Sequence, residues 1–464
     1  MKFINKSIIA LMAASMAFSS CENFLEEEPF ESQTELNAFQ SVEDVKKALI
    51  GSYNSIIEVG ADYLHYSMNI PEMMSDNVYN TPSTGGGTVL IFGNFDFTVI
   101  SGGLENAWFD GYILIDRANF TIAKLEEFTG EDAYLEEQIR GEALALRAMG
   151  HFDLLKNFGT SLDRNHSEAN SGIPVMLASE VSYPSRNTVA EVYDQIFADL
   201  DEAISLLSGK GAVDIYRFNE VSVKALAARV ALYAGDYANA AKYADDVITE
   251  TSLLGADAFV SNWSSVSEGE VLFRAFSKVD DEYITGYWAA NEAGVTRRAS
   301  QELIDLYEAG DARYDAFFLE DATLGTLVKK FSTNDGGAFL QNRSLDVLRV
   351  SEMYLISAEA HFRTNNATQA LTRLNTLRAN RGVANLTSLS EQEILDERRR
   401  ELAFEGHRFY DLKRLGKDLD RSAMADEPKV TVNNLPAGDK RWVFPIPRRE
   451  LIVNPNLVQS PMWQ

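Results

Sequence analysis

Apolar residues recur at helical spacing through most of this sequence and predict a mainly α-helical protein. Each predicted helix has one apolar face and one polar face. The first four segments of this kind are 42–57, 104–128, 136–158 and 188–207. Thr188 and Glu191, three residues apart, have the spacing of a capping box at the start of the fourth helix.

Two later segments repeat one pattern of small and apolar residues, which is typical of tetratricopeptide helix pairs. The first copy has Lys224, Ala228, Ala231, Gly235, Tyr237, Ala240, Ala244 and Val247; the second has Tyr354, Ala358, His361, Asn365, Ala367, Ala370, Leu374 and Leu377. Small residues let two antiparallel helices approach closely, and stacked pairs bury a continuous core. With the two pairs at 42–128 and 136–207, the pattern predicts four helix pairs in a right-handed superhelical scaffold.

Two long segments interrupt the helical pattern. The first, 67–103, is rich in Asn, Thr and Gly, and the second, 261–342, alternates aromatic residues with Gly, Ser, Asn and Asp. Residues 270–276 are predicted to form a strand. Long irregular segments in a compact protein are usually functional or disordered, so we treat both as insertions into a scaffold at about 36–260 and 345–416.

The segment 396–416 is the densest run of charged and apolar residues in the chain. Leu395, Leu402, Phe409, Leu412 and Leu415 form one apolar seam, which predicts a single helix. On its charged face, Glu397 with Arg400 and Glu405 with Arg408 have the spacing of ion pairs. We interpret these charges as structural, tying the last helix to the scaffold.

The N-terminus has the pattern of a lipoprotein signal peptide. Residues 1–20 combine two lysines, an apolar stretch and small residues just before Cys21. Cys21 is the only cysteine, so it cannot form an internal disulfide and is the predicted lipidation site. An acidic tether at 21–35 follows, and no later apolar run is long enough to span a membrane.

Charge and motifs argue against several functions. With 42 basic and 69 acidic residues, a net charge of −27, the chain is a poor partner for nucleic acid. The five histidines are scattered and do not form a zinc motif. Gly85–Gly87 lacks the Lys-Ser/Thr of a phosphate loop, and no Gly-x-Ser-x-Gly sequence is present. We therefore predict a protein without catalytic activity.

The amino-acid sequences of five segments resemble those of the SusD/RagB family of outer-membrane lipoproteins. In 397–414 the resemblance rests on Glu397, Arg398, Glu401, Leu402, Glu405, Gly406, Arg408, Asp411, Leu412 and Arg414. The other segments are 142–159, 186–203, 442–447 and 454–457. The resemblance implies one SusD-like domain at 36–464, anchored to the outer membrane and facing the cell exterior. It also implies a glycan ligand and a SusC-like TonB-dependent transporter as partner.

A glycan site needs exposed aromatic rings beside hydrogen-bonding side chains, and both insertions supply them. The predicted ligand-binding residues are Asp76, Asn77, Tyr79, Asn80, Trp263, Tyr283, Tyr287, Trp288 and Asn291. The resemblance points to Asp76 and Asn77 in particular. The acidic loop at 76–80 permits a Ca²⁺ ion without requiring one, and no other cofactor is expected. Capture of a peptide or another nutrient is the alternative, and a hydrolase is a third hypothesis.

Overall fold

A computed structural model describes residues 38–57, 63–212, 214–263, 269–276, 290–291, 294–331, 333–335, 338–340 and 344–464. Its helices are α3 (Val42–Asn54), α4 (Ile70–Met73), α5 (Thr88–Gly93), α6 (Gly102–Glu126), α7 (Ala133–Phe158), α8 (Val189–Leu207), α9 (Glu220–Tyr233), α10 (Tyr237–Glu250), α11 (Ala256–Trp263), α12 (Gln301–Asp305), α13 (Ala312–Phe317), α14 (Val350–Arg363), α15 (Ala367–Asn380), α16 (Glu391–Glu401), α17 (Arg408–Arg414) and α18 (Arg448–Val453). The predicted signal peptide, Cys21 and the tether lie outside the described residues.

Short strands supplement the helices, and they pair two by two in antiparallel fashion. They are β1 (Val78–Asn80), β2 (Val271–Ala275), β3 (Ala290–Asn291), β4 (Gly294–Val295), β5 (Arg297–Ala299), β6 (Phe318–Asp321), β7 (Gly325–Val328), β8 (Thr333–Asp335), β9 (Ala338–Leu340), β10 (Leu345–Arg349), β11 (Leu419–Asp420) and β12 (Asn434–Leu435). The strand predicted at 270–276 is β2, and it pairs with β10.

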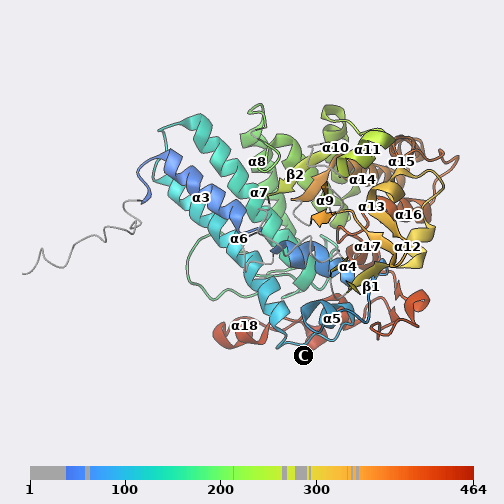
Figure 1. Cartoon of the computed structure of the whole chain (residues 1–464). Helices are drawn as coiled ribbons and strands as arrows, with labels where there is room; N and C mark the ends of the chain where they lie inside the picture. Colours follow the sequence, from blue (N-terminus) through green and yellow to red (C-terminus); the bar gives the residue numbers. More distant parts are fainter. Residues whose placement is uncertain are drawn as a thin grey trace, which may run out of the picture.

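The prediction of a mainly helical scaffold built from four helix pairs is confirmed. The pairs are α3 with α6, α7 with α8, α9 with α10, and α14 with α15, and each pair packs together (Figure 1). The capping box of Thr188 and Glu191 is present at the start of α8. Gly235 has φ +72°, so it makes the turn between α9 and α10 where a side chain would be strained.

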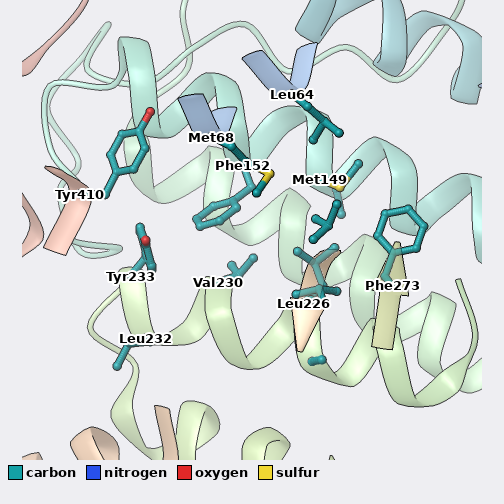
Figure 2. Close-up of a cluster of buried hydrophobic side chains, with 14 of the residues drawn as sticks. Leu64, Met68, Met149, Phe152, Leu226, Val230, Leu232, Tyr233, Phe273 and Tyr410 are labelled. Carbon is teal, nitrogen blue, oxygen red and sulfur yellow. The ribbon is translucent and has the colours of Figure 1, made fainter. Parts of the chain in front are cut away.

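The core lies where α7 crosses its neighbours. Figure 2 shows Met149 and Phe152 of α7 above Leu226 and Val230 of α9, with Met68 of the first insertion on the far side. Glycine permits the closest approach: a Cβ at position 111 of α6 would lie 2.7 Å from the side chain of Leu154. Real side chains do not tolerate that distance, so the absence of a side chain sets the spacing of α6 and α7.

The prediction of one continuous helix at 396–416 is wrong. The segment forms α16 and α17, separated by a turn at 402–407. Phe404 and Gly406 have φ of 70° and 78°, which end the first helix. The carboxylate of Glu72, a fully buried residue of the first insertion, accepts hydrogen bonds from the backbone N–H groups of Phe404 (3.0 Å) and Gly406 (2.9 Å).

The charged residues at 397–401 of α16 are buried rather than exposed, and they tie this helix to the scaffold as predicted. Glu401 accepts hydrogen bonds from Arg313, Arg349 and Arg381, which belong to α13, to β10 and to the C-terminal cap of α15. All four side chains are at most 3% exposed. We call these four residues the Glu401 cluster.

One of the two predicted ion pairs in this segment is present. Glu397 and Arg400 pair at 2.5 Å. Glu405 and Arg408 do not pair; instead Glu405 contacts Lys330 and Arg349. The turn between α16 and α17 separates their side chains, so the helical spacing of three does not apply.

Removing a cation from the Glu401 cluster should destabilise the whole protein. Arg381→Met leaves the buried carboxylates of Glu401 and Glu270 short of a partner, and we expect a loss of about 3–5 kcal/mol in the free energy of unfolding. Urea denaturation measures the loss. Arg140→Met, which breaks the exposed pair with Glu202, is the control and should cost less than about 1 kcal/mol. Equal midpoints for the two variants would contradict a structural role for the cluster.

Candidate functional site

The structure brings the two predicted insertions together as a small sheet. Strand β1 of the first insertion pairs with β5 of the second, and Tyr79 lies opposite Arg298. The pairing continues on both sides, because Thr81 N–H donates to the Thr296 carbonyl at 3.0 Å and Ser300 N–H donates to the Asn77 carbonyl at 2.7 Å. We call the outer surface of this ladder the β1–β5 face.

Asp76 and Asn77, which were predicted to bind a ligand, are buried and hydrogen-bonded to other residues of the protein. Asp76 is 4% exposed and accepts two hydrogen bonds of 2.8 Å from the guanidinium of Arg408. Asn77 is buried, accepts from Arg399 at 2.7 Å and donates to Glu72 at 2.7 Å. Burial opposes ionisation of Asp76, but the positive charges of Arg408 and Arg399 outweigh it and hold its pKa below the ordinary value.

These contacts anchor β1 to the segment between α16 and α17. Arg399 lies on α16, Arg408 begins α17, and Glu72 binds the turn between these helices. Burial raises the pKa of Glu72 even though three hydrogen bonds favour its ionised form. The position of β1 is therefore fixed by residues more than 300 positions further along the chain.

A third arginine, which the sequence did not indicate, holds the first insertion on both sides of β1. The guanidinium of Arg421 donates to three backbone carbonyls, those of Ser75 (2.8 Å), Gly93 (2.6 Å) and Met73 (2.8 Å). Burial lowers the pKa of Arg421 to about 10. Its targets are backbone groups, so no side-chain pattern in the sequence indicated them.

Tyr79 is the predicted residue that the β1–β5 face leaves partly exposed. Arg298 lies opposite it on the same face and donates to the carbonyls of Leu324 and Thr326 in the β6–β7 hairpin. Burial and the neighbouring carboxylate of Glu427 raise the pKa of Tyr79, so its hydroxyl remains protonated at neutral pH. An aromatic ring flanked by a cation and a carboxylate can stack on a sugar ring and hydrogen-bond its hydroxyls.

The other predicted residues fall into three groups. Asn80 is buried, and within the described residues its side-chain oxygen has no hydrogen-bond partner. Asn291 lies in the β3–β4 hairpin, which is joined to the residue that follows β1, because the Thr81 hydroxyl donates to the Val295 carbonyl. The aromatic residues Tyr283, Tyr287 and Trp288 lie outside the described residues.

Trp263, which was also predicted to bind a ligand, is packed in the core. Its ring packs edge-on against Phe317 at 5.4 Å, and the ammonium of Lys330 lies 4.9 Å from its centroid. The residue is 2% exposed. Trp263 ends α11, whose apolar side packs on α13, so the helical spacing directs the ring inward.

Neither a metal site nor a membrane span is found in the part of the chain that the structure describes. Within those ranges, no three His, Cys, Asp or Glu side chains are grouped so that they could hold a metal ion. The helices among the described residues are too short or too polar to cross a lipid bilayer.

Comparison with known proteins gives the family. Residues 281–463 match the model of the SusD family, and residues 23–232 match a related model described as starch-binding and associating with the outer membrane. The two matches together take in most of the chain. The chain belongs to the SusD/RagB family.

Individual relatives agree along nearly the full length of this SusD-family protein. A SusD-like protein of Formosa agariphila is 26% identical, and the match covers 99% of each chain. A SusD superfamily protein of Bacteroides vulgatus has a structure with a TM-score of 0.80 and 27% identity, covering 92% of this chain and 100% of that one. A laminarin-binding SusD-like protein shares the fold, with a TM-score of 0.69 at 24% identity and coverage of 91% and 100%. Carbohydrate binding and outer-membrane association are properties of this family.

Breaking the ion pair between Asp76 and Arg408 should destabilise β1 without changing its exposed side chains. In Asp76→Asn the buried guanidinium loses its counter-charge, and we expect a loss of about 3–5 kcal/mol in stability. Hydrogen exchange at the β1 and β5 amides should accelerate more than exchange in α7. Asp96→Asn, an exposed carboxylate in the same insertion, is the control. Unchanged exchange in β1 would contradict the anchoring role of the pair.

Proposed function

We propose that this SusD-family protein captures a polysaccharide or oligosaccharide at the cell surface and delivers it to a SusC-like TonB-dependent transporter in the outer membrane. It acts without catalysis. Cys21 carries the lipid that anchors it, with the folded body on the exterior of the cell. The observation that supports this proposal most directly is the β1–β5 face, where the partly exposed Tyr79 of the first insertion lies between Arg298 of the second insertion and the carboxylate of Glu427.

The rigidity of the β1–β5 face suits capture by stacking. Arg298 is held by two carbonyls of the β6–β7 hairpin, and β1 is held from behind by Arg399 and Arg408. A preformed surface loses little conformational entropy when a flexible glycan binds to it.

Binding to a glycan panel tests the function. We expect affinity electrophoresis and calorimetry to identify a polysaccharide that the folded protein binds, with laminarin and starch among those tried. Tyr79→Ala should weaken that binding about three- to tenfold, because a stacking contact is worth about 0.5–1.5 kcal/mol. Trp288→Ala should do the same. Tyr134→Ala removes an exposed tyrosine on α7 and should leave affinity unchanged.

Two results would count against the function. Absence of binding to every glycan by folded protein would refute it. New reducing ends after incubation of pure protein with the bound oligosaccharide would show a hydrolase instead.

Lipidation can be tested independently, because the chain has a single cysteine. Cells that express the full-length chain should incorporate labelled palmitate into it, and the protein should sediment with membranes. Cys21→Ser should abolish the label and release the protein from the membrane fraction, since one lipidated residue supplies the anchor. Unchanged sedimentation of Cys21→Ser would show that another contact holds the protein at the membrane.

A further inference from the structure

A groove outside the β1–β5 face has the dimensions of a ligand site. It lies between α6, the segment 174–184 and α18, and its volume is about 450 Å³. Small-molecule sites usually enclose about 300–1,000 Å³. In Figure 1, α18 lies at the lower left beside the end of α6, well apart from β1 at the right. We call it the α6–α18 groove.

Aromatic rings line the α6–α18 groove from two sides, and two of them are open to solvent. Phe109 of α6 is 63% exposed and Tyr183 of the facing segment is 55% exposed. Beneath them, Trp108 and Tyr112 pack together with ring centroids 4.9 Å apart. Soluble proteins leave few large apolar side chains exposed, so their concentration around one groove indicates a binding surface.

The walls of the α6–α18 groove are fixed by hydrogen bonds that do not involve a ligand. The hydroxyl of Tyr112 donates to the Pro174 carbonyl at 2.8 Å. Asn454, just after α18, donates to the Pro184 carbonyl at 2.8 Å, and Asn119 of α6 donates to Met176 at 3.0 Å. The segment 174–184 is therefore tied at both ends, and the cavity exists before anything enters it.

Among the residues that the structure describes, the charged side chains lining the α6–α18 groove are both carboxylates, and none of the lining side chains is basic. Glu450 is partly buried, and this burial raises the pKa of its carboxyl group. The charge of Glu105 adds to the rise, whereas Arg449 and a hydrogen bond with Trp108 oppose it. Asp116 is exposed at the rim. Carboxylates repel anionic ligands and accept hydrogen bonds from hydroxyl groups. The lining therefore selects against sulfated or acidic glycans and favours a neutral polyol.

The backbone of the same wall favours a sugar over a peptide strand. Among the described residues, the N–H and C=O groups of 177–182 make no hydrogen bonds to other backbone groups, so they remain available to ligand hydroxyls. The chain bends at 178–180. A bent segment cannot pair in register with an extended peptide, whereas sugar hydroxyls need no such register.

We propose that the α6–α18 groove is a second carbohydrate subsite, which stacks a neutral pyranose ring between Phe109 and Tyr183 and binds its hydroxyls with Asp116 and Glu450. This inference rests on the proposed function of glycan capture. The apolar CH faces of the sugar cover the exposed rings, and its hydroxyl edge meets the carboxylates.

Calorimetry with the full-length protein tests the second subsite. The probe is the neutral hexasaccharide released from whichever polysaccharide the panel identifies. We expect two sites per chain in the wild-type protein, and one site in Tyr183→Ala and in Phe109→Ala. Tyr134 is also 55% exposed, so Tyr134→Ala is a matched control and should keep two sites. Tyr79→Ala should weaken the other site and leave the groove site intact.

The outcomes separate this inference from the proposed function. If the wild-type protein binds the hexasaccharide at one site, and Tyr183→Ala does not alter it, the groove is not a subsite although glycan capture stands. If no glycan binds, both proposals fail. Light scattering tests whether a second copy of this chain occupies the groove instead of a sugar. A dimer that Tyr183→Ala dissociates would make the groove an interface between two copies and would refute the proposed subsite.

Discussion

Glu401 and its three arginine partners hold together parts of the chain that local sequence does not connect. Each ion of the Glu401 cluster is buried, and burial of an unpaired charge would cost several kcal/mol. The same environment acts on the neighbouring Glu397: burial opposes its ionisation, but Arg313 and other arginines lower its pKa to about 2. The charges are therefore stable only when α13, β10, α15 and α16 are all in place, which makes the cluster a requirement for the assembled fold.

The β1–β5 face depends on the same region through a second set of contacts. Glu72 binds the turn that follows α16, Arg399 and Arg408 bind Asp76 and Asn77, and Arg421 binds the backbone of the first insertion. Arg399 and Arg421 are buried, and the side chain of Arg408 is 12% exposed. The residues at 397–414 on which the resemblance to the family rests thus act from the interior, where they fix the strand that carries Tyr79.

The molecule uses its aromatic residues in two ways. Rings such as Trp263 and Phe317 pack edge-on in the core, where burial stabilises the fold. Tyr79, Phe109 and Tyr183 remain accessible on a rigid frame, at the β1–β5 face and the α6–α18 groove. If both proposed surfaces stack on sugars, together they would hold a long glycan more firmly than either would alone, because binding at one raises the effective concentration of the glycan at the other.

The amino-acid sequence alone predicts the helix pairs, because small and apolar residues at helical spacing give each helix one face that packs closely on its partner. It also indicates that the charges at 396–416 have a structural role. The burial of Asp76, Asn77 and Trp263 could not be predicted in this way, because their partners Arg408, Arg399 and Phe317 lie far along the chain. The break of the segment into α16 and α17 also depends on a distant residue, since Glu72 supplies the hydrogen bonds that stabilise the turn. The periodicity of apolar residues shows which face of a helix or strand is apolar. The exposure of a given residue depends, in addition, on whether a distant segment of the chain packs over it.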